Sequence, residues 1–168
     1  MKTEIQLTAT RSNDIRSYVR STLSLPRYLH SLRTAETAVR LCGRFGRDYG
    51  LREEDARVAG ISHDMAREME EQDLIELAGR DVYPVSEEEM EKPTLLHGRA
   101  AAVLMSERFG ERREHVLKAL RWHTFGHPDM GALGMILYVA DYIEPGRPHV
   151  DEEFFHEVME KDTLEEMV

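Results

Sequence analysis

Hydrophobic positions recur at three- and four-residue spacing through most of this chain. The clearest run follows Pro26 and places apolar or small side chains on one helical face: Tyr28, Leu32, Ala35, Val39 and Cys42. This spacing, with proline at the start and glycines near 46 and 50 at the end, predicts an amphipathic helix. Alternating runs rich in β-branched residues are missing. The pattern therefore predicts an all-α fold.

Further helices are expected downstream, separated by glycines, prolines and acidic connectors. Ser86 and Glu89 have the spacing of a capping box after Pro84. The expected segments are Arg52 to Asp64, a short helix through Leu74, Leu77 and Ala78, Thr94 to Phe109, Arg112 to Thr124, Met130 to Ile143, and a terminal helix between Asp151 and Val168. We expect one domain at residues 21–150, preceded by an N-terminal extension at 1–20. The segment 151–168 is expected to pack on that domain as a C-terminal helix.

Composition narrows the classes of protein to consider. The 168 residues include 32 acidic and 22 basic side chains, and the resulting net charge of -10 disfavours nucleic acid as a partner. No apolar run reaches the roughly 18 residues of a membrane span, and the single cysteine, Cys42, suits a helix core in a reducing compartment. We expect a cytoplasmic protein with a small-molecule partner and no membrane contact. The sequence leaves open whether the protein forms a homodimer.

The candidate chemistry centres on the dipeptide His63-Asp64. His30, His97, His123 and Asp141 lie in other apolar segments. Taken singly, each of these histidines is better explained as a satisfied core residue, and Asp141 equally well as a buried cap or partner of an arginine. Four such histidines with two interior aspartates instead indicate a metal centre, because metal coordination compensates buried polar groups. The remaining histidines with charged or loop neighbours, His115, His149 and His156, are expected to face solvent.

The ligand types restrict the metal. Imidazole and carboxylate together suit Fe, Mn, Co, Ni or Zn rather than Ca. Six protein ligands cannot saturate two such ions, so positions would remain for water and substrate oxygens. That is the requirement of a hydrolytic centre with two transition-metal ions.

Five motifs in order carry a resemblance to a known family. They are Arg27-Tyr28-Leu29-His30, Gly60-Ile61-Ser62-His63-Asp64-Met65-Ala66-Arg67, Leu96-His97-Gly98, His123-Thr124-Phe125-Gly126-His127-Pro128, and Asp141-Tyr142-Ile143-Glu144-Pro145-Gly146-Arg147. This set resembles the HD-domain metal-dependent phosphohydrolases. It is similar to the bacterial YqeK family of symmetrical diadenosine tetraphosphate hydrolases. The resemblance covers about residues 20–150.

The resemblance implies a helical bundle that hydrolyses dinucleoside polyphosphates, Ap4A to two ADP, with a two-metal-activated hydroxide. It implies two divalent or trivalent ions, with iron as the first choice over Mn, Co, Ni or Zn. His30, His63, Asp64 and Asp141 would hold one ion, and Asp64 would bridge to a second held by His97 and His123. Besides Asp64, the expected catalytic residues are Arg67 and Arg147, as phosphate-charge stabilisers. Relatives usually carry Lys at the position of Arg67 and commonly Arg at that of His127, so no chemical role is assigned to His127.

Other functions are compatible with the same motifs. The chain could be an HD-type phosphohydrolase acting on nucleoside mono- or triphosphates or a cyclic dinucleotide. A di-iron HD-type oxygenase uses a similar ligand set, and would be recognised by dioxygen consumption. A degenerate HD module would only bind nucleotide or protein, but the retention of all six ligand-type residues argues against it.

Overall fold

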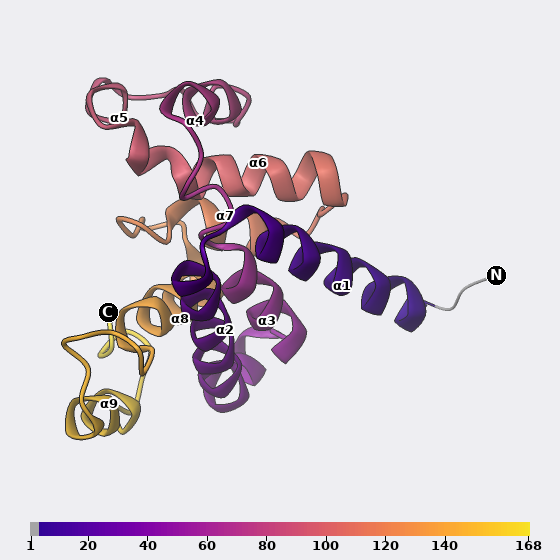
Figure 1. The fold of residues 1–168 in the computed structure, drawn as a ribbon. Helices are drawn as coiled ribbons and strands as arrows, with labels where there is room; N and C mark the ends of the chain where they lie inside the picture. Colours follow the sequence, from indigo (N-terminus) through magenta and orange to yellow (C-terminus); the bar gives the residue numbers. More distant parts are fainter. Residues whose placement is uncertain (1–3) are drawn as a thin grey trace.

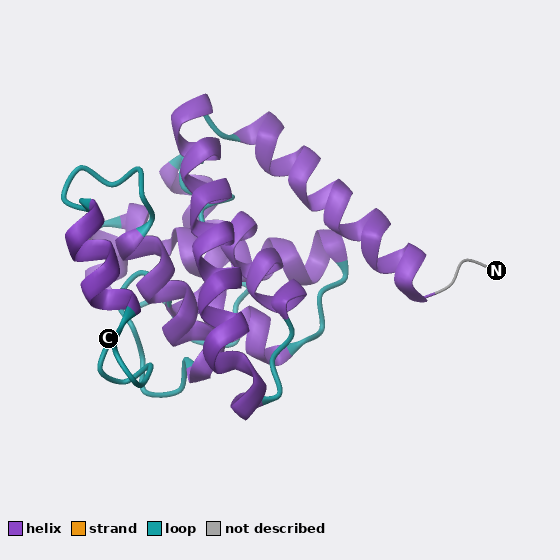
Figure 2. Cartoon of the chain, turned by 90° about the horizontal axis from the view of Figure 1, so that it is seen from below, coloured by secondary structure: helices purple, strands orange, loops and turns teal. Residues whose placement is uncertain are grey.

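A computed structural model describes residues 4–168, with side chains from Ser12 onward, and its regular elements are helices joined by turns and loops (Figure 1). No strand forms within these residues, as the colouring of Figure 2 shows. The all-α prediction is therefore confirmed. The elements in order are α1 Glu4–Thr22, α2 Leu25–Phe45, the 3-10 turn η1 Gly46–Tyr49, α3 Glu53–Ser62, α4 Glu71–Ala78, α5 Glu87–Glu91, η2 Pro93–Leu96, α6 His97–Phe109, α7 Glu114–Trp122, α8 Gly131–Ile143 and α9 Glu152–Met159.

Helices α2 and α3 form the closest pair of the bundle. Gly60 of α3 lies directly against the backbone of Ala35 in α2, and a Cβ atom at position 60 would overlap the Ala35 Cα atom. Glycine is required here because any larger residue would push the two helices apart. This contact fixes the separation of two segments that carry His30 and His63.

The buried apolar side chains fall into two clusters. The main cluster joins α1, α2 and α3 to α6–α8, and Phe155 of α9 and the more C-terminal Leu164 also belong to it. A smaller cluster packs α4 against η2 and α6 through Leu74, Leu96 and Val103. The segment after residue 150 thus shares its core with the helices that precede it.

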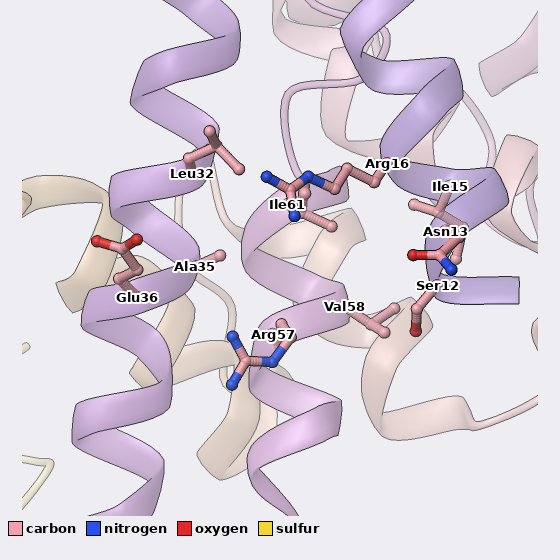
Figure 3. A pocket seen from close by; sticks show the side chains of 10 residues that line it. All are labelled: Ser12, Asn13, Ile15, Arg16, Leu32, Ala35, Glu36, Arg57, Val58 and Ile61. Carbon is pink, nitrogen blue, oxygen red and sulfur yellow. The ribbon is translucent and has the colours of Figure 1, made fainter. Parts of the chain in front are cut away.

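Helix α1 was not expected from the sequence. It runs obliquely across the bundle, and its first turns extend beyond the other helices (Figures 1 and 2). Where it crosses α2 and α3 it leaves a cavity of about 230 Å³. Figure 3 shows Arg16 of α1 extending over this cavity towards Leu32 and Ile61. The Arg16 Nε–H donates to the Tyr28 hydroxyl at 3.1 Å, which ties α1 to α2.

Helix α3 ends earlier than predicted, which changes the position of the His63-Asp64 pair. The pair was expected on the helix, but α3 stops at Ser62 and residues 63–68 form turns. The Ser62 hydroxyl donates to the Val58 carbonyl at 2.7 Å, and the His63 Nδ1 atom contacts the Gly60 carbonyl at 2.8 Å. These side chains satisfy the last carbonyls of the helix in place of further backbone bonds.

Two other expectations need correction. The C-terminal helix ends at Met159 rather than continuing towards Val168, because Asp162, Thr163 and Glu166 bond one another in turns while Leu164 is buried. Asp141, expected to be an interior aspartate, keeps 23% of its side chain exposed, because it lies on the face of helix α8 where exposed or half-buried residues recur.

No helix in the described residues has the combination of length and apolar character that a membrane span needs.

Candidate metal centre

Five segments bring the six predicted site residues to one place. His30 comes from the middle of α2, His63 and Asp64 from the turn after α3, and His97 from the first position of α6. His123 directly follows α7, and Asp141 lies near the end of α8. The four histidines and Asp64 are each no more than 6% exposed.

Asp64 lies between two pairs of histidines. Its Oδ1 atom is 3.3 Å from His97 Nε2 and 3.9 Å from His123 Nε2. Its Oδ2 atom is 3.7 Å from His30 Nε2 and 3.6 Å from His63 Nε2. One carboxylate therefore faces a histidine pair with each oxygen, which is the arrangement of a ligand shared by two ions.

The Asp141 carboxylate lies close to one of these pairs, His30 and His63. Its Oδ1 atom is 2.9 Å from His30 Nε2 and 3.6 Å from His63 Nε2. Two groups of potential ligands thus have their donor atoms within 4.8 Å of one another: His30, His63 and Asp141 on one side, and His63, Asp64 and His123 on the other.

Three of the histidines are oriented by the same local contact. The Nδ1 atom of each lies close to the carbonyl oxygen three residues earlier: His63 to Gly60 at 2.8 Å, His97 to Thr94 at 2.7 Å and His123 to Leu120 at 2.8 Å. A carbonyl only accepts, so Nδ1 carries the proton and donates it. In the neutral ring the Nε2 atom then presents its lone pair to the centre.

His30 is oriented by Glu144 instead. Its Nδ1 atom lies 3.0 Å from Oε1 of Glu144, a carboxylate that is only 1% exposed. Glu144 also accepts from the Arg33 guanidinium and from the Gly146 backbone N–H at 2.6 Å. The sequence analysis assigned no role to Glu144 or Arg33, although Glu144 lies inside the Asp141 to Arg147 motif.

The arrangement of Nε2 atoms calls for a cation. His30 and His63 bring theirs to 3.2 Å of each other, and His97 and His123 to 3.1 Å. Two lone pairs cannot form a hydrogen bond, so each contact requires a proton or a metal ion to be favourable. Imidazole nitrogens oriented by Nδ1 donation and shared with carboxylates are typical transition-metal ligands. The residues present therefore fit a transition-metal centre.

The pKa shifts of His63 and His123, which belong to different histidine pairs, run in opposite directions. Burial disfavours a charged His63, but the Asp64 and Asp141 carboxylates outweigh it and raise the pKa of His63 to about 9. Burial together with His63 and His97 lowers the pKa of His123 to about 3. The neighbouring histidines overcome the opposite effect of burial and hold the pKa of Asp64 and Asp141 well below the usual range. Both carboxylates are therefore charged and available as ligands.

The two arginines predicted to bind phosphate, Arg147 and Arg67, differ from each other in their contacts. Arg147 donates through Nε to the Asp141 carbonyl at 2.8 Å and pairs through Nη2 with the Asp141 carboxylate. Arg67 is half-buried, and its Nη1 donates to the Thr94 carbonyl at 3.4 Å. Arg27, which sequence reasoning passed over, donates to Oδ2 of Asp64 at 2.9 Å. Its spacing of three positions before His30, within the same helical turn, was the available signal.

The histidines expected outside the site lie outside it. His115, His149 and His156 are exposed. His127 stacks on Trp122 with ring centroids 4.2 Å apart and an angle of 12° between the rings.

Comparison with known proteins places this geometry in a family. The HD domain model matches residues 27–146. The symmetrical bis(5'-nucleosyl)-tetraphosphatase of Bacillus subtilis is 36% identical over 136 residues, which cover 80% of this chain and 70% of that protein. The protein of the same name from Staphylococcus aureus is 34% identical over 133 residues, covering 75% and 63%. That from Halalkalibacterium halodurans is 34% identical over 134 residues, covering 77% and 66%. The aligned part is thus 63 to 70% of the length of these relatives.

A solved structure agrees with the sequence relatives. A protein from Clostridium acetobutylicum, described as a predicted HD superfamily hydrolase involved in NAD metabolism, superposes with a TM-score of 0.79 at 36% sequence identity. The match covers 92% of this chain and 79% of that one. The resemblance inferred from the five motifs is confirmed, and the chain belongs to the HD-domain family.

Proposed function

We propose that this protein is a metal-dependent hydrolase that cleaves diadenosine tetraphosphate symmetrically into two ADP. The observation that carries the proposal is the position of Asp64, whose two oxygens face separate histidine pairs. The names of the relatives that share the HD domain support the substrate class.

The same geometry supports a division of ligands between two ions. We assign His30, His63, Asp64 and Asp141 to one ion, and Asp64, His97 and His123 to the other. The donor set suits Fe, Mn, Co, Ni and Zn alike, because all five accept imidazole and carboxylate. Iron is our first choice among them, as the resemblance of the five motifs implied. Bound ions would supply Lewis acidity towards the phosphoryl oxygens and make water nucleophilic at neutral pH.

The chain itself holds the ligands and balances charge. The Nδ1 contacts of the four histidines fix each ring so that Nε2 points to the centre, which removes the cost of orienting ligands during the reaction. Arg147 and Arg67 are proposed to stabilise negative charge on the phosphates. Arg147 is the better placed of the two, because Asp141 anchors its guanidinium beside the centre.

The proposed reaction breaks the tetraphosphate at its central bridging oxygen. Water adds to one of the two inner phosphorus atoms, and the bond from that phosphorus to the central bridging oxygen breaks. Each product is then a nucleoside diphosphate. The departing ADP carries its new charge on a terminal phosphate, which an arginine can neutralise without a strong general acid.

Product analysis tests this function directly. Purified protein, with its metal content measured, is incubated with Ap4A, ATP and AMP in separate reactions, and the products are separated by chromatography. We expect ADP alone from Ap4A, and oxygen-18 from labelled water on the terminal phosphate of one ADP of each pair. AMP plus ATP would reject the symmetrical cut, and turnover of AMP or ATP without turnover of Ap4A would favour another HD phosphohydrolase activity.

The setting we propose for this activity is the cytoplasm, with a small-molecule nucleotide as the substrate and a homodimer as a possible assembly. The single cysteine, Cys42, is 3% exposed and lies in the helical core, which suits a reducing compartment. The net charge of -10 disfavours binding to a nucleic acid.

A further inference from the structure

An open cleft lies beside the metal centre on the His30 side. It has a volume of about 290 Å³ and lies between the start of α2 and the segment that follows α8. The side chains of Arg27, Arg33 and Arg147 line it, together with His30, Glu68 and Glu144. The cleft therefore combines a histidine of the metal centre with three guanidinium groups.

The three arginines follow one pattern. Each is paired with a different carboxylate: Arg27 with Asp64, Arg33 with Glu144 and Arg147 with Asp141. Each also keeps about a third of its side chain exposed, at 33%, 35% and 31% respectively. A guanidinium has five N–H groups, so one edge can hold the carboxylate while the others bind a second anion.

Arg33 is held by two bonds to a single carboxylate. Its Nε and Nη2 atoms both bond Glu144, and its guanidinium covers Gly146 so closely that any side chain at position 146 would overlap it. The Glu144 carboxylate raises the pKa of Arg33 further, which keeps the group charged. A fixed, charged fork is suited to recognising phosphate oxygens in one orientation.

The acidic residues of the cleft do not remove this character. Glu68 bonds the Ser24 backbone N–H at 2.6 Å and the Ser24 hydroxyl at 2.7 Å, so its carboxylate is already satisfied. Glu144 is 1% exposed and lies behind Arg33 and His30. Bound metal ions would add further positive charge next to the cleft.

We infer that this arginine cleft binds the two phosphates of one nucleoside diphosphate half of the substrate, and that Arg33 is a specificity-determining residue for them. The inference rests on the proposed function and adds to it the requirement for at least two phosphates on that side of the centre. The cleft, at about 290 Å³, has room for two phosphates beside His30.

Binding of ADP, pyrophosphate and AMP to the metal-loaded protein tests the inference. Calorimetry is carried out on the wild type, Arg33→Gln and the control Arg40→Gln, with metal content measured for each. Arg40 is exposed and lies two turns further along the same helix, so the control removes the same charge outside the cleft. We expect Arg33→Gln to weaken ADP and pyrophosphate about tenfold and AMP less than twofold, with unchanged metal content.

Two results would overturn the inference. Affinities of Arg33→Gln within twofold of the wild type would show that Arg33 does not bind phosphate. Weaker binding accompanied by loss of metal would show that Arg33 acts only through Glu144 and His30. The proposed function fails separately: if wild-type protein binds ADP through Arg33 but does not cleave Ap4A, the cleft stands and the activity does not.

Discussion

The metal centre and the surroundings of Asp81 are both clusters of buried charged side chains, and they differ in what faces each charge. The Asp81 side chain is 2% exposed and accepts from Arg99 Nε at 3.2 Å and from Arg121 Nη2 at 2.8 Å. Arg99 also donates to the Pro84 carbonyl at 3.1 Å and to Glu89 at 2.7 Å. Donors thus face the Asp81 and Glu89 carboxylates, and protein groups alone neutralise them. On the donor side, Arg121 Nη1 is buried without a hydrogen-bond partner.

In the metal centre acceptors face one another. The Nε2 atoms of His97 and His123 meet at 3.1 Å while both Nδ1 atoms are committed to carbonyls. Burying polar groups without partners is costly, so a chain retains such a cluster when another species completes it. A structural ionic network therefore differs from a functional centre: the protein itself pairs the charges of the first, and the second turns ring lone pairs towards one another.

Removing the central carboxylate of each cluster should have the largest effects, and these effects should differ between the two clusters. Asp64→Ala should reduce Ap4A turnover by more than about 100-fold and lower the metal content, because even loss of a supporting residue at a metal site costs about 10 to 100-fold. Asp81→Ala should instead lower the free energy of unfolding by about 3–5 kcal/mol, since two buried guanidiniums lose their partner. Product assays, elemental analysis and chemical denaturation separate these effects.

Two controls accompany that pair. His115→Ala removes an exposed imidazole and should leave turnover and metal content unchanged. Asp81→Asn keeps the shape of the side chain and allows the comparison if Asp81→Ala does not fold. Equal loss of turnover in Asp64→Ala and His115→Ala would mean that the centre is not where the geometry places it.

Metal removal should affect one cluster only. Elemental analysis of protein prepared without chelator should find two transition-metal ions per chain. Stripping them should lower the melting temperature by on the order of 10 °C, because ligand at 1,000 times its Kd contributes about 4 kcal/mol. The drop should persist in Asp81→Asn and be much smaller in Asp64→Ala. A single ion bound without His97 and His123 would contradict the shared position of Asp64.

One glutamate in each cluster can be changed in the same way, Glu144 beside His30 and Glu89 beside Arg99. Glu144→Gln removes the charge that orients His30, and should lower metal affinity or turnover by about tenfold or more. Glu89→Gln removes the charge paired with Arg99 in the other cluster, and should leave both quantities within twofold. Metal titration of the stripped proteins measures the difference. If both variants bind metal as the wild type does, the Nδ1 partner of His30 is not important for the centre.

The sequence predicted the ligand-type residues better than the groups that orient them. Helical periodicity placed the start of α2 within one residue and its end near the glycines at 46 and 50, and motif order brought His30, His97 and Asp141 together across more than a hundred positions. Glu144 and Arg33 were missed, because their partners lie 114 and 111 positions away and no local pattern encodes such pairing. The contact of a histidine Nδ1 atom with the carbonyl three residues earlier is local in sequence. At His63 this contact accompanies the end of α3 at Ser62, before the predicted boundary.

The smallest effect is expected where a histidine lies near the centre in sequence but outside it in space. His127 stacks on Trp122, and its Nδ1 accepts the Asp129 backbone N–H at 3.0 Å. His127→Ala should therefore keep turnover within about twofold and metal content unchanged. It should cost only about 1 kcal/mol of folding free energy, the usual worth of one aromatic contact. His123→Ala, four positions earlier, is the matched comparison and should lose metal. Steady-state kinetics and thermal denaturation of both variants test this, and a tenfold lower kcat in His127→Ala at unchanged stability would place His127 in the chemistry.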